Sequence, residues 1–379
     1  MKEKNHGAGL LPSLLIMIFT AAGFWLLGGQ QKTELVRRVG SSFEKGVVTE
    51  ILQDNIQRDG TRVGEQRLRV HMFTGPRKGQ EVETTSSAGF LFGAPCRVGM
   101  NVVVMMSVAG STTVSSVYSR DREHTIYVFG GLYLILLVLI GGMQGLKGAL
   151  GLIFTFVNIV CFELPLIYRG YSPYAVTVTV CALSTLVTMY FIGGATRKTV
   201  AATAGTVSGI ICAGLTTWCF GRASGIGGWN VSNIESLMTL WNIKGIQVGQ
   251  LMFCALLISS LGAVMDVAMS IASAMQEIYS QNPALHRWQL FRSGLRVGRD
   301  MMGTDSNTLI LAFCGTELSA LLLNYAYDLP WLQIINSNNI GIAVMQGLGG
   351  SFGVVLSVPF TVLCGALLLR PLGADPADI

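Results

Sequence analysis

The sequence contains little charge, and its long apolar runs contain no Lys or Arg at all. Charged residues make up 12% of the chain, while hydrophobic residues reach 51% and the mean hydropathy is +0.53. A typical soluble domain has roughly 25% charged residues. This composition argues against a soluble globular domain and indicates a protein whose main solvent is lipid.

Histidine is also scarce, and the cysteines are not paired in the sequence. The chain has 4 histidines, and none of its 8 cysteines stands in a C-x-x-C spacing. Cysteines placed in this way argue against a disulfide framework or a zinc site. There is no phosphate-binding glycine loop, no Ser–His pair in one region and no G-x-G-D motif. We therefore predict that the protein is not an enzyme and holds no metal or cofactor.

Eight apolar runs are long enough to cross a bilayer, whose hydrocarbon core of about 30 Å takes roughly 20 helical residues. We therefore predict an α-helical integral membrane protein with about eight transmembrane helices. The expected spans are residues 9–28, 125–143, 149–168, 173–194, 199–220, 247–275, 305–325 and 340–369. The first run lacks a clear small-x-small cleavage site, so we interpret it as a retained signal anchor.

The basic residues of the short loops give the orientation. One loop, residues 276–303, contains Arg287, Arg292, Arg296 and Arg299. Short loops rich in Lys and Arg stay in the cytoplasm. We therefore predict that this loop and both termini are cytoplasmic. Within the loop, residues 283–298 have the amphipathic pattern of a helix that lies along the inner leaflet.

Residues 31–122, between the first two runs, show alternating instead of continuous apolarity, which is typical of β-strands. The expected strands are residues 45–54, 66–74, 79–86, 100–108 and 111–118. Five short strands predict a small extracytoplasmic β-barrel of the OB or SH3-like kind. Long external segments translocate whatever their charge, so the basic residues here indicate no nucleic-acid partner. The expected domains are residues 1–30, 31–122 and 123–379.

Acidic side chains lie within or at the ends of several runs, although no run supplies a basic partner. They are Glu163, Asp266, Asp300, Asp305 and Glu317. A carboxylate at bilayer depth costs at least ~2.5–3.5 kcal/mol, so it must be protonated, solvated in a cavity or bound to a cation. We predict an inner ion site at Asp266 and Asp305, with Glu163 and Glu317 as outer relay candidates.

Small and polar residues share helix faces with the two aspartates of the inner site. One face of the run 247–275 carries Ser259, Gly262, Asp266, Ser270 and Ser273, and the run 305–325 has a matching face that begins at Asp305 and Thr308. Two interpretations stay open. Small residues at this spacing allow close packing of two membrane helices, and the same faces could line an ion path that includes Ser270.

The segment from Asp300 to Thr308 is the densest polar cluster at any boundary of a run. Thr304 or Asp305 could be the N-cap of a helix, because these residue types favour that position. Alternatively, Asp300, Asn307 and Thr308 contribute oxygen atoms to a cation site shared with Asp266. Both interpretations stay open from the sequence.

Several of these segments resemble the YibE/YibF family of bacterial multi-pass membrane proteins. The similar segments are QGLKGALGL (144–152), TRKTVAATAGTVSG (196–209), LGAVMDVAMSIASAMQEI (261–278) and FRSGLRVGRDMMGTDSNTLILAF (291–313). The external domain makes the chain similar to the longer, YibE-like type. The resemblance implies a bacterial cytoplasmic membrane and no established activity. Because shorter family members resemble only the membrane part, it also implies a homo-oligomer or a pair with such a protein.

The carboxylates favour one functional hypothesis over another. The leading hypothesis is a secondary transporter or permease, coupled to protons or another cation, in which the lipid bilayer surrounds the spans. The alternative is a non-transporting membrane scaffold or accessory subunit whose external domain binds an envelope partner. The sequence leaves the substrate open.

Overall fold

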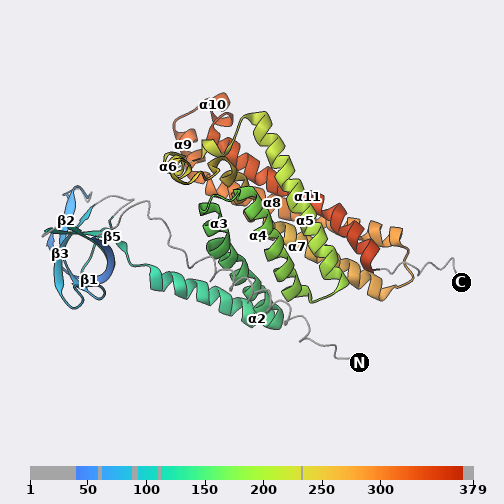
Figure 1. Ribbon diagram of the computed structural model, residues 1–379, viewed down its shortest axis with the longest axis horizontal. Helices are drawn as coiled ribbons and strands as arrows, with labels where there is room; N and C mark the ends of the chain where they lie inside the picture. Colours follow the sequence, from blue (N-terminus) through green and yellow to red (C-terminus); the bar gives the residue numbers. More distant parts are fainter. Residues whose placement is uncertain (1–39, 59–61, 88–92, 110–111, 232–233, 370–379) are drawn as a thin grey trace. The chain divides into compact units, whose positions relative to one another are not determined.

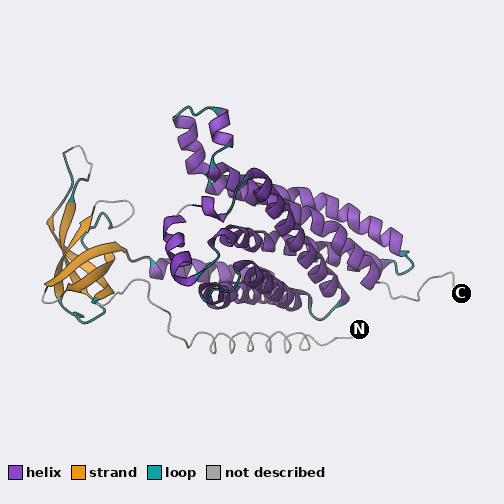
Figure 2. Cartoon of the chain, turned by 45° about the horizontal axis from the view of Figure 1, so that its top comes forward, coloured by secondary structure: helices purple, strands orange, loops and turns teal. Residues whose placement is uncertain are grey.

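The structure, a computed structural model, describes residues 40–58, 62–87, 93–109, 112–231 and 234–369. The chain divides into two compact units, one of residues 31–136 and one that contains Leu137–Ile379. The strands belong to the first unit, and the described part of the second unit is helical (Figure 2). The predicted first span, residues 9–28, lies outside the described residues.

The first unit contains a closed five-stranded barrel in which the strands follow the order β1-β2-β3-β5-β4. The strands are β1 (Ser41–Gln53), β2 (Glu65–Met72), β3 (Glu81–Ser87), β4 (Asn101–Ala109) and β5 (Thr112–Arg120). The pairing of β3 with β5 is parallel and the other pairings are antiparallel. This crossover is the Greek-key arrangement of OB-type barrels. The predicted barrel is therefore confirmed, with strand ends that differ by a few residues.

Alternation along the strands explains why the barrel forms. On β2, Leu68 and Val70 are fully buried, whereas Arg67 and Arg69 face outward. The outward arginines are paired with acids on the neighbouring strands, and Arg69 lies 2.5 Å from Glu50. The outer face of β2 is therefore a solvated, charge-compensated surface around an apolar core.

The α-helices of the described part of the chain are labelled as in Figure 1. They are α2 (Glu123–Asn158), α3 (Leu164–Tyr168), α4 (Pro173–Gly193), α5 (Arg197–Ser224), α6 (Ile234–Lys244), α7 (Leu251–Gln281), α8 (Arg287–Thr316), α9 (Leu318–Ala326), α10 (Trp331–Ile335) and α11 (Asn338–Leu369). A π-helical turn, η1 (Ile159–Glu163), joins α2 to α3. Within the described residues, five helical segments are long and apolar enough to cross a membrane, or six when α8 and α9, bent by 58°, count as one span.

Helix α2 is broken at Gly142, whose φ of 54° and ψ of −133° are not helical. After this break the chain folds back on itself. A Cβ atom placed on Gly145 would lie only 2.0 Å from the carbonyl oxygen of Leu137, whereas eight residues of straight helix span about 12 Å. Only a residue without Cβ reaches such a φ without strain. The break separates the predicted spans 125–143 and 149–168.

Helix α11 is the centre of the helical unit and packs along α5, α7 and α8. Glycines make the closest approaches: a Cβ on Gly205 of α5 would lie 1.8 Å from Thr361 Oγ1, and one on Gly298 of α8 would lie 2.3 Å from Val358. Removing the side chain at such positions lets membrane helices approach closely. The apolar core around Val358 is fully buried.

The structure corrects two expectations about the arginine-rich loop. Residues 283–298 do not form a separate helix along the inner leaflet, because α8 runs without interruption from Arg287 to Thr316. Leu290 and Gly298 are buried against the bundle. Packing against other helices, and not the amphipathic pattern alone, therefore determines where this segment lies. The proposed N-caps, Thr304 and Asp305, consequently lie within a continuous helix.

Candidate functional site

Asp266 and Asp305 come from neighbouring helices and are close enough to interact electrostatically. Asp266 lies midway along α7, and Asp305 lies in the second half of α8. Asp266 is exposed and Asp305 is half-buried on the surface of the described bundle. The two helices pack against each other. The structure therefore brings the two aspartates of the predicted inner site together, on a face that no described helix covers.

The other residues predicted on α7 and α8 extend this face. Ser270 lies one turn after Asp266 and is half-buried, whereas Asn307 and Thr308 are exposed. The Thr308 hydroxyl donates to the carbonyl oxygen of Thr304, 3.0 Å away. Asp300 is exposed more than one helical turn before Asp305. We define the polar face as Asp266, Ser270, Asp305, Asn307 and Thr308.

Close packing does not explain the small residues on the polar face of α7. A Cβ atom on Gly262 would have no neighbour within 4 Å, and Ser259 is exposed. The interpretation that this stripe packs tightly on α8 is therefore wrong for these two residues. The α7–α8 contact uses other positions, among them Gly294, where a Cβ would lie 2.6 Å from the sulfur of Met275.

Glu163 occupies a different environment, because it is only 2% exposed and lies inside the bundle. The hydroxyl of Thr177 on α4 donates a hydrogen bond to its Oε1. Its second oxygen, Oε2, has no hydrogen-bond partner among the described residues. The thiols of Cys181 on α4 and Cys254 on α7 lie near enough to interact electrostatically with the carboxyl group. Glu163 is thus enclosed but incompletely bonded.

The π-helical turn η1 ends at Glu163 and is followed by Pro165. Proline lacks an N–H group and cannot continue the hydrogen bonding of an α-helix. Single π turns inside α-helices often occur at functional sites. The helical geometry therefore changes locally next to the carboxylate.

Sequence reasoning missed the polar side chains that line the same helix contact as Glu163. The Nδ2 of Asn158, the Oγ of Ser184 and the Oγ1 of Thr188 are buried without a hydrogen-bond partner among the described residues. Thr177, Ser184 and Thr188 follow one face of α4 at i, i+7 and i+11, and a Cβ on Gly151 would lie 2.9 Å from Thr188. That spacing was a signal in the sequence, but hydroxyls in membrane helices are common and do not by themselves indicate a site.

Glu317 lies at the junction of α8 and α9, apart from Glu163 and the buried polar side chains of α2 and α4. It is half-buried and caps the end of α8, where the two helices are bent by 58°. Its backbone N–H donates to the carbonyl oxygen of Phe313. No hydrogen bond or ion pair joins Glu317 to Glu163 among the described residues, so the two carboxylates occupy separate places in the helical unit.

Comparison with protein families gives one match. The family model described as YibE/F-like protein matches residues 129–371, which include every residue of the polar face and the Glu163 cluster. No curated protein and no solved structure matched the chain.

Proposed function

The chain belongs to the YibE/F-like family, and we propose that it is a secondary transporter or permease driven by protons or another cation. The observation that carries the proposal is the pair Asp266 and Asp305, which interact with each other. Helix α7 contains no Lys or Arg, and the last arginine of α8, Arg299, lies six residues before Asp305. Each carboxylate at bilayer depth costs at least ~2.5–3.5 kcal/mol. Two adjacent anions cost more, because like charges disfavour ionisation. A bound proton or cation removes this cost.

The proposed pathway includes the enclosed carboxylate. Glu163 supplies a site that is shielded from water and has a free acceptor oxygen, while the polar face of α7 and α8 is open to its surroundings. Intramembrane carboxylates form proton relays in pumps and transporters, and an open and an enclosed carboxylate would be two positions of such a relay. We assign Asp266 and Asp305 to the inner ion site and Glu163 and Glu317 to outer relay positions.

The open polar face also supports assembly. Carboxylates in membrane proteins face the interior of a bundle or a water-filled cavity, because lipid does not solvate them. Asp266 is exposed in the described unit, so a second subunit would complete its surroundings. We propose a homo-oligomer or a pair with a related membrane protein that lacks the external domain.

We further propose eight spans with the barrel outside the bacterial cytoplasmic membrane and both termini in the cytoplasm. The helical segment Glu123–Tyr168 has 46 residues and would be about 69 Å long if straight, more than twice the hydrocarbon core of about 30 Å. The break at Gly142 supports two spans in its place. The orientation follows from the arginines of residues 276–303.

Labelling with a membrane-impermeant thiol reagent tests the orientation. Lys78 in the barrel and Ser280 at the end of α7 are both exposed, and each is replaced by cysteine in a background without the exposed Cys219 and Cys314. In intact cells we expect labelling of Lys78→Cys and not of Ser280→Cys. After the membrane is permeabilised, both should react. The reverse result in intact cells would overturn the orientation.

Substitution of the paired aspartates tests the ion site. Asn keeps the size and hydrogen bonding of Asp but does not ionise. A bound cation stabilises the folded protein, by about 2.7 kcal/mol at 100 times its Kd. We expect the melting temperature of purified wild-type protein to rise with one alkali cation or with acidification, and the double variant Asp266→Asn, Asp305→Asn to lose this response. Glu277→Gln, which lies on the same face of α7 and is exposed, should keep it.

The same measurement separates the two functional classes. In a scaffold, permanently protonated aspartates are already neutral, so the double Asn variant should respond to cations as the wild type does. That outcome would contradict the hypothesis that Asp266 and Asp305 bind an ion. It would favour the alternative, an accessory subunit whose barrel binds an envelope partner. Any ligand that a thermal-shift screen identifies would then be tested for flux in proteoliposomes, with the double variant as the inactive control.

A further inference from the structure

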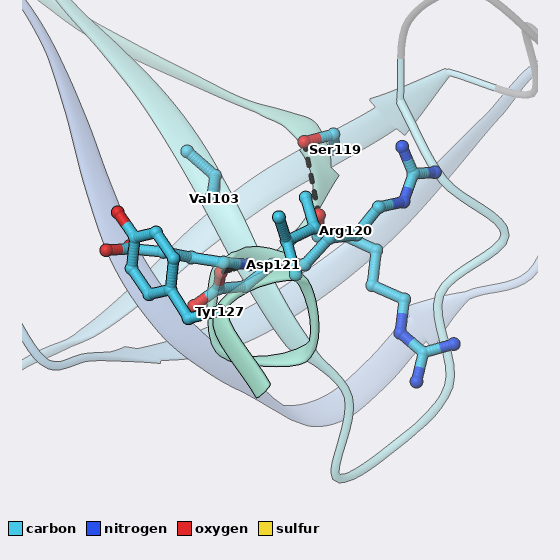
Figure 3. A pocket seen from close by; sticks show the side chains of 8 residues that line it. Val103, Ser119, Arg120, Asp121 and Tyr127 are labelled. Carbon is cyan, nitrogen blue, oxygen red and sulfur yellow. Dashed lines mark hydrogen bonds between the residues drawn. The ribbon is translucent and has the colours of Figure 1, made fainter. Parts of the chain in front are cut away.

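A cavity of about 420 Å³ lies where the barrel leads into α2. Figure 3 shows its lining, with Val103 and Tyr127 on one side and Arg120 on the other. The complete lining is Val103, Ser119, Arg120, Asp121, Arg122, Glu123, Ile126 and Tyr127. The cavity belongs to the first compact unit and is remote in sequence from the polar face and from Glu163 and Thr177.

The charges of this cavity are not balanced. Its two acids, Asp121 and Glu123, are both paired with Lys45, which lies 3.6 Å from Asp121. These contacts, first of all the hydrogen bond with Glu123, raise the pKa of Lys45, so the lysine stays charged and compensates the acids. The guanidinium groups of Arg120 and Arg122 have no acidic partner among the described residues. The cavity therefore offers two uncompensated arginines to an anion.

The position of the cavity along the chain gives it an apolar side. Helix α2 turns apolar at Ile126, four residues after Arg122, and Ile126, Tyr127 and Phe129 are 62%, 68% and 77% exposed. Such a helix face suits lipid. With the topology proposed above, on which this step rests, the arginines would lie at the depth of the lipid headgroups and Tyr127 at the interface that aromatic residues prefer. The same cavity thus joins cationic donors to the beginning of the hydrocarbon region.

We propose that this cavity binds the phosphate of an anionic phospholipid headgroup in the leaflet next to the barrel. Arg presents a fork of N–H donors that matches phosphate oxygens in pairs. Ile126 and Tyr127 contact the glycerol and the first acyl carbons, which inorganic phosphate lacks. A bound lipid would fix the junction between the barrel and the first part of α2.

Lipid binding to the full-length protein tests the proposal. The detergent-purified chain is titrated with a short-chain phosphatidylglycerol, with phosphatidylcholine of the same chain length and with inorganic phosphate, and bound molecules are counted by native mass spectrometry. Phosphatidylcholine has the same phosphate but also a cationic choline, which the two arginines repel, so the difference between the two lipids should be roughly tenfold in affinity. We expect the wild type to bind phosphatidylglycerol about tenfold more tightly than phosphatidylcholine. The variant Arg120→Gln, Arg122→Gln should lose that preference.

Two further variants make the result specific. The double variant Arg97→Gln, Lys78→Gln removes the same charge from exposed positions of the barrel outside the cavity, and it should bind as the wild type does. Arg120→Lys, Arg122→Lys keeps the charge without the fork, and its preference should be intermediate. Equal loss in both glutamine variants would overturn the proposal, since net charge alone would then explain binding. Binding of inorganic phosphate as tight as that of the lipid, with the same dependence on Arg120 and Arg122, would overturn the phospholipid as its source.

Discussion

Glu163 and Asp266 are carboxylates in the same helical unit, but their surroundings differ. Glu163 is 2% exposed and receives one hydrogen bond from Thr177. Asp266 is exposed, and the charged group that interacts with it is another acid, Asp305. The chain itself builds the surroundings of Glu163, whereas Asp266 depends on water, an ion or a second subunit. A carboxyl group is therefore part of the packed interior at position 163, whereas at position 266 it has to find its partners outside the described helices.

The largest expected effect is a difference in stability between the alanine variants of Glu163 and Asp266. Glu163→Ala leaves a cavity and removes the partner of the buried Thr177 hydroxyl, so we expect a loss of about 2–4 kcal/mol of stability. Asp266→Ala removes an exposed side chain without described packing, and its cost should be below about 0.5 kcal/mol. Unfolding of the purified protein in mixed detergent measures both. Glu163→Gln, which keeps the volume, should retain most of the stability. Similar losses for both alanine variants would show that Asp266 is packed as tightly as Glu163.

Glycine substitutions sharpen the contrast between the enclosed and the open face. In Gly205→Ala the new methyl group would collide with Thr361, whose Oγ1 lies 1.8 Å from the Cβ position and whose Cα lies 2.9 Å from it. Overpacking of this kind costs about 1–3 kcal/mol. In Gly262→Ala the methyl group meets nothing within 4 Å, and Ala favours a helix by up to about 1 kcal/mol. We expect opposite signs in the melting temperature of the isolated chain.

A second measurement on the glycine pair addresses assembly. If a second subunit covers the polar face, Gly262→Ala should weaken the oligomer while the single chain stays stable, as size-exclusion chromatography with light scattering would show. Gly205→Ala, deep inside one chain, should leave the oligomer fraction of the surviving folded protein unchanged. Destabilisation of the single chain by Gly262→Ala would contradict an open face.

Much of the fold could be predicted from the sequence because two periodicities are plain. Alternation located the barrel strands, and apolar length located the helices. Residues 283–298 were predicted wrongly, because an amphipathic pattern says that a face is buried but not against what. In the structure Leu290 and Gly298 bury that face on α7 and α11, so a helix expected at the membrane surface became the start of α8.

The candidate site could be predicted only in part. Acids stand out in runs without basic residues, so Glu163, Asp266 and Asp305 were found from the sequence. Their different surroundings were not, because exposure depends on which helices pack together. The partners Thr177 and Cys254 were also missed, since they come from α4 and α7 and a single sequence carries no signal that joins them to Glu163. The packing of α11 against three helices is long-range information of the same kind.

A third carboxylate, Asp54 on the barrel, provides the smallest and most controlled test of the comparison, because one of its oxygens accepts three hydrogen bonds. Its Oδ1 accepts from Gln66 Nε2, the backbone N–H of Asn55 and the guanidinium of Arg62, each at 2.8 Å. The hydrogen bond from Gln66, followed by those from Asn55 and Arg62, holds the pKa of Asp54 below its usual value. A carboxyl group whose pKa is lower in the folded state stabilises that state above its unfolded pKa of about 3.9 and loses the effect as the pH falls through its folded pKa.

We therefore expect the barrel, expressed as residues 40–122, to give a β-rich circular dichroism spectrum and a cooperative melt at neutral pH, and Asp54→Asn to lower the melting temperature at pH 6. The difference between the two proteins should shrink below about pH 4, where the wild-type carboxyl group is protonated too. Glu65→Gln, which changes an exposed acid on β2, serves as the control and should follow the wild type. A constant difference between wild type and Asp54→Asn at every pH would mean that Asp54 acts by shape and neutral hydrogen bonding. The negative charge of Asp54 would then contribute nothing to stability, and in this respect Asp54 would no longer differ from Glu163.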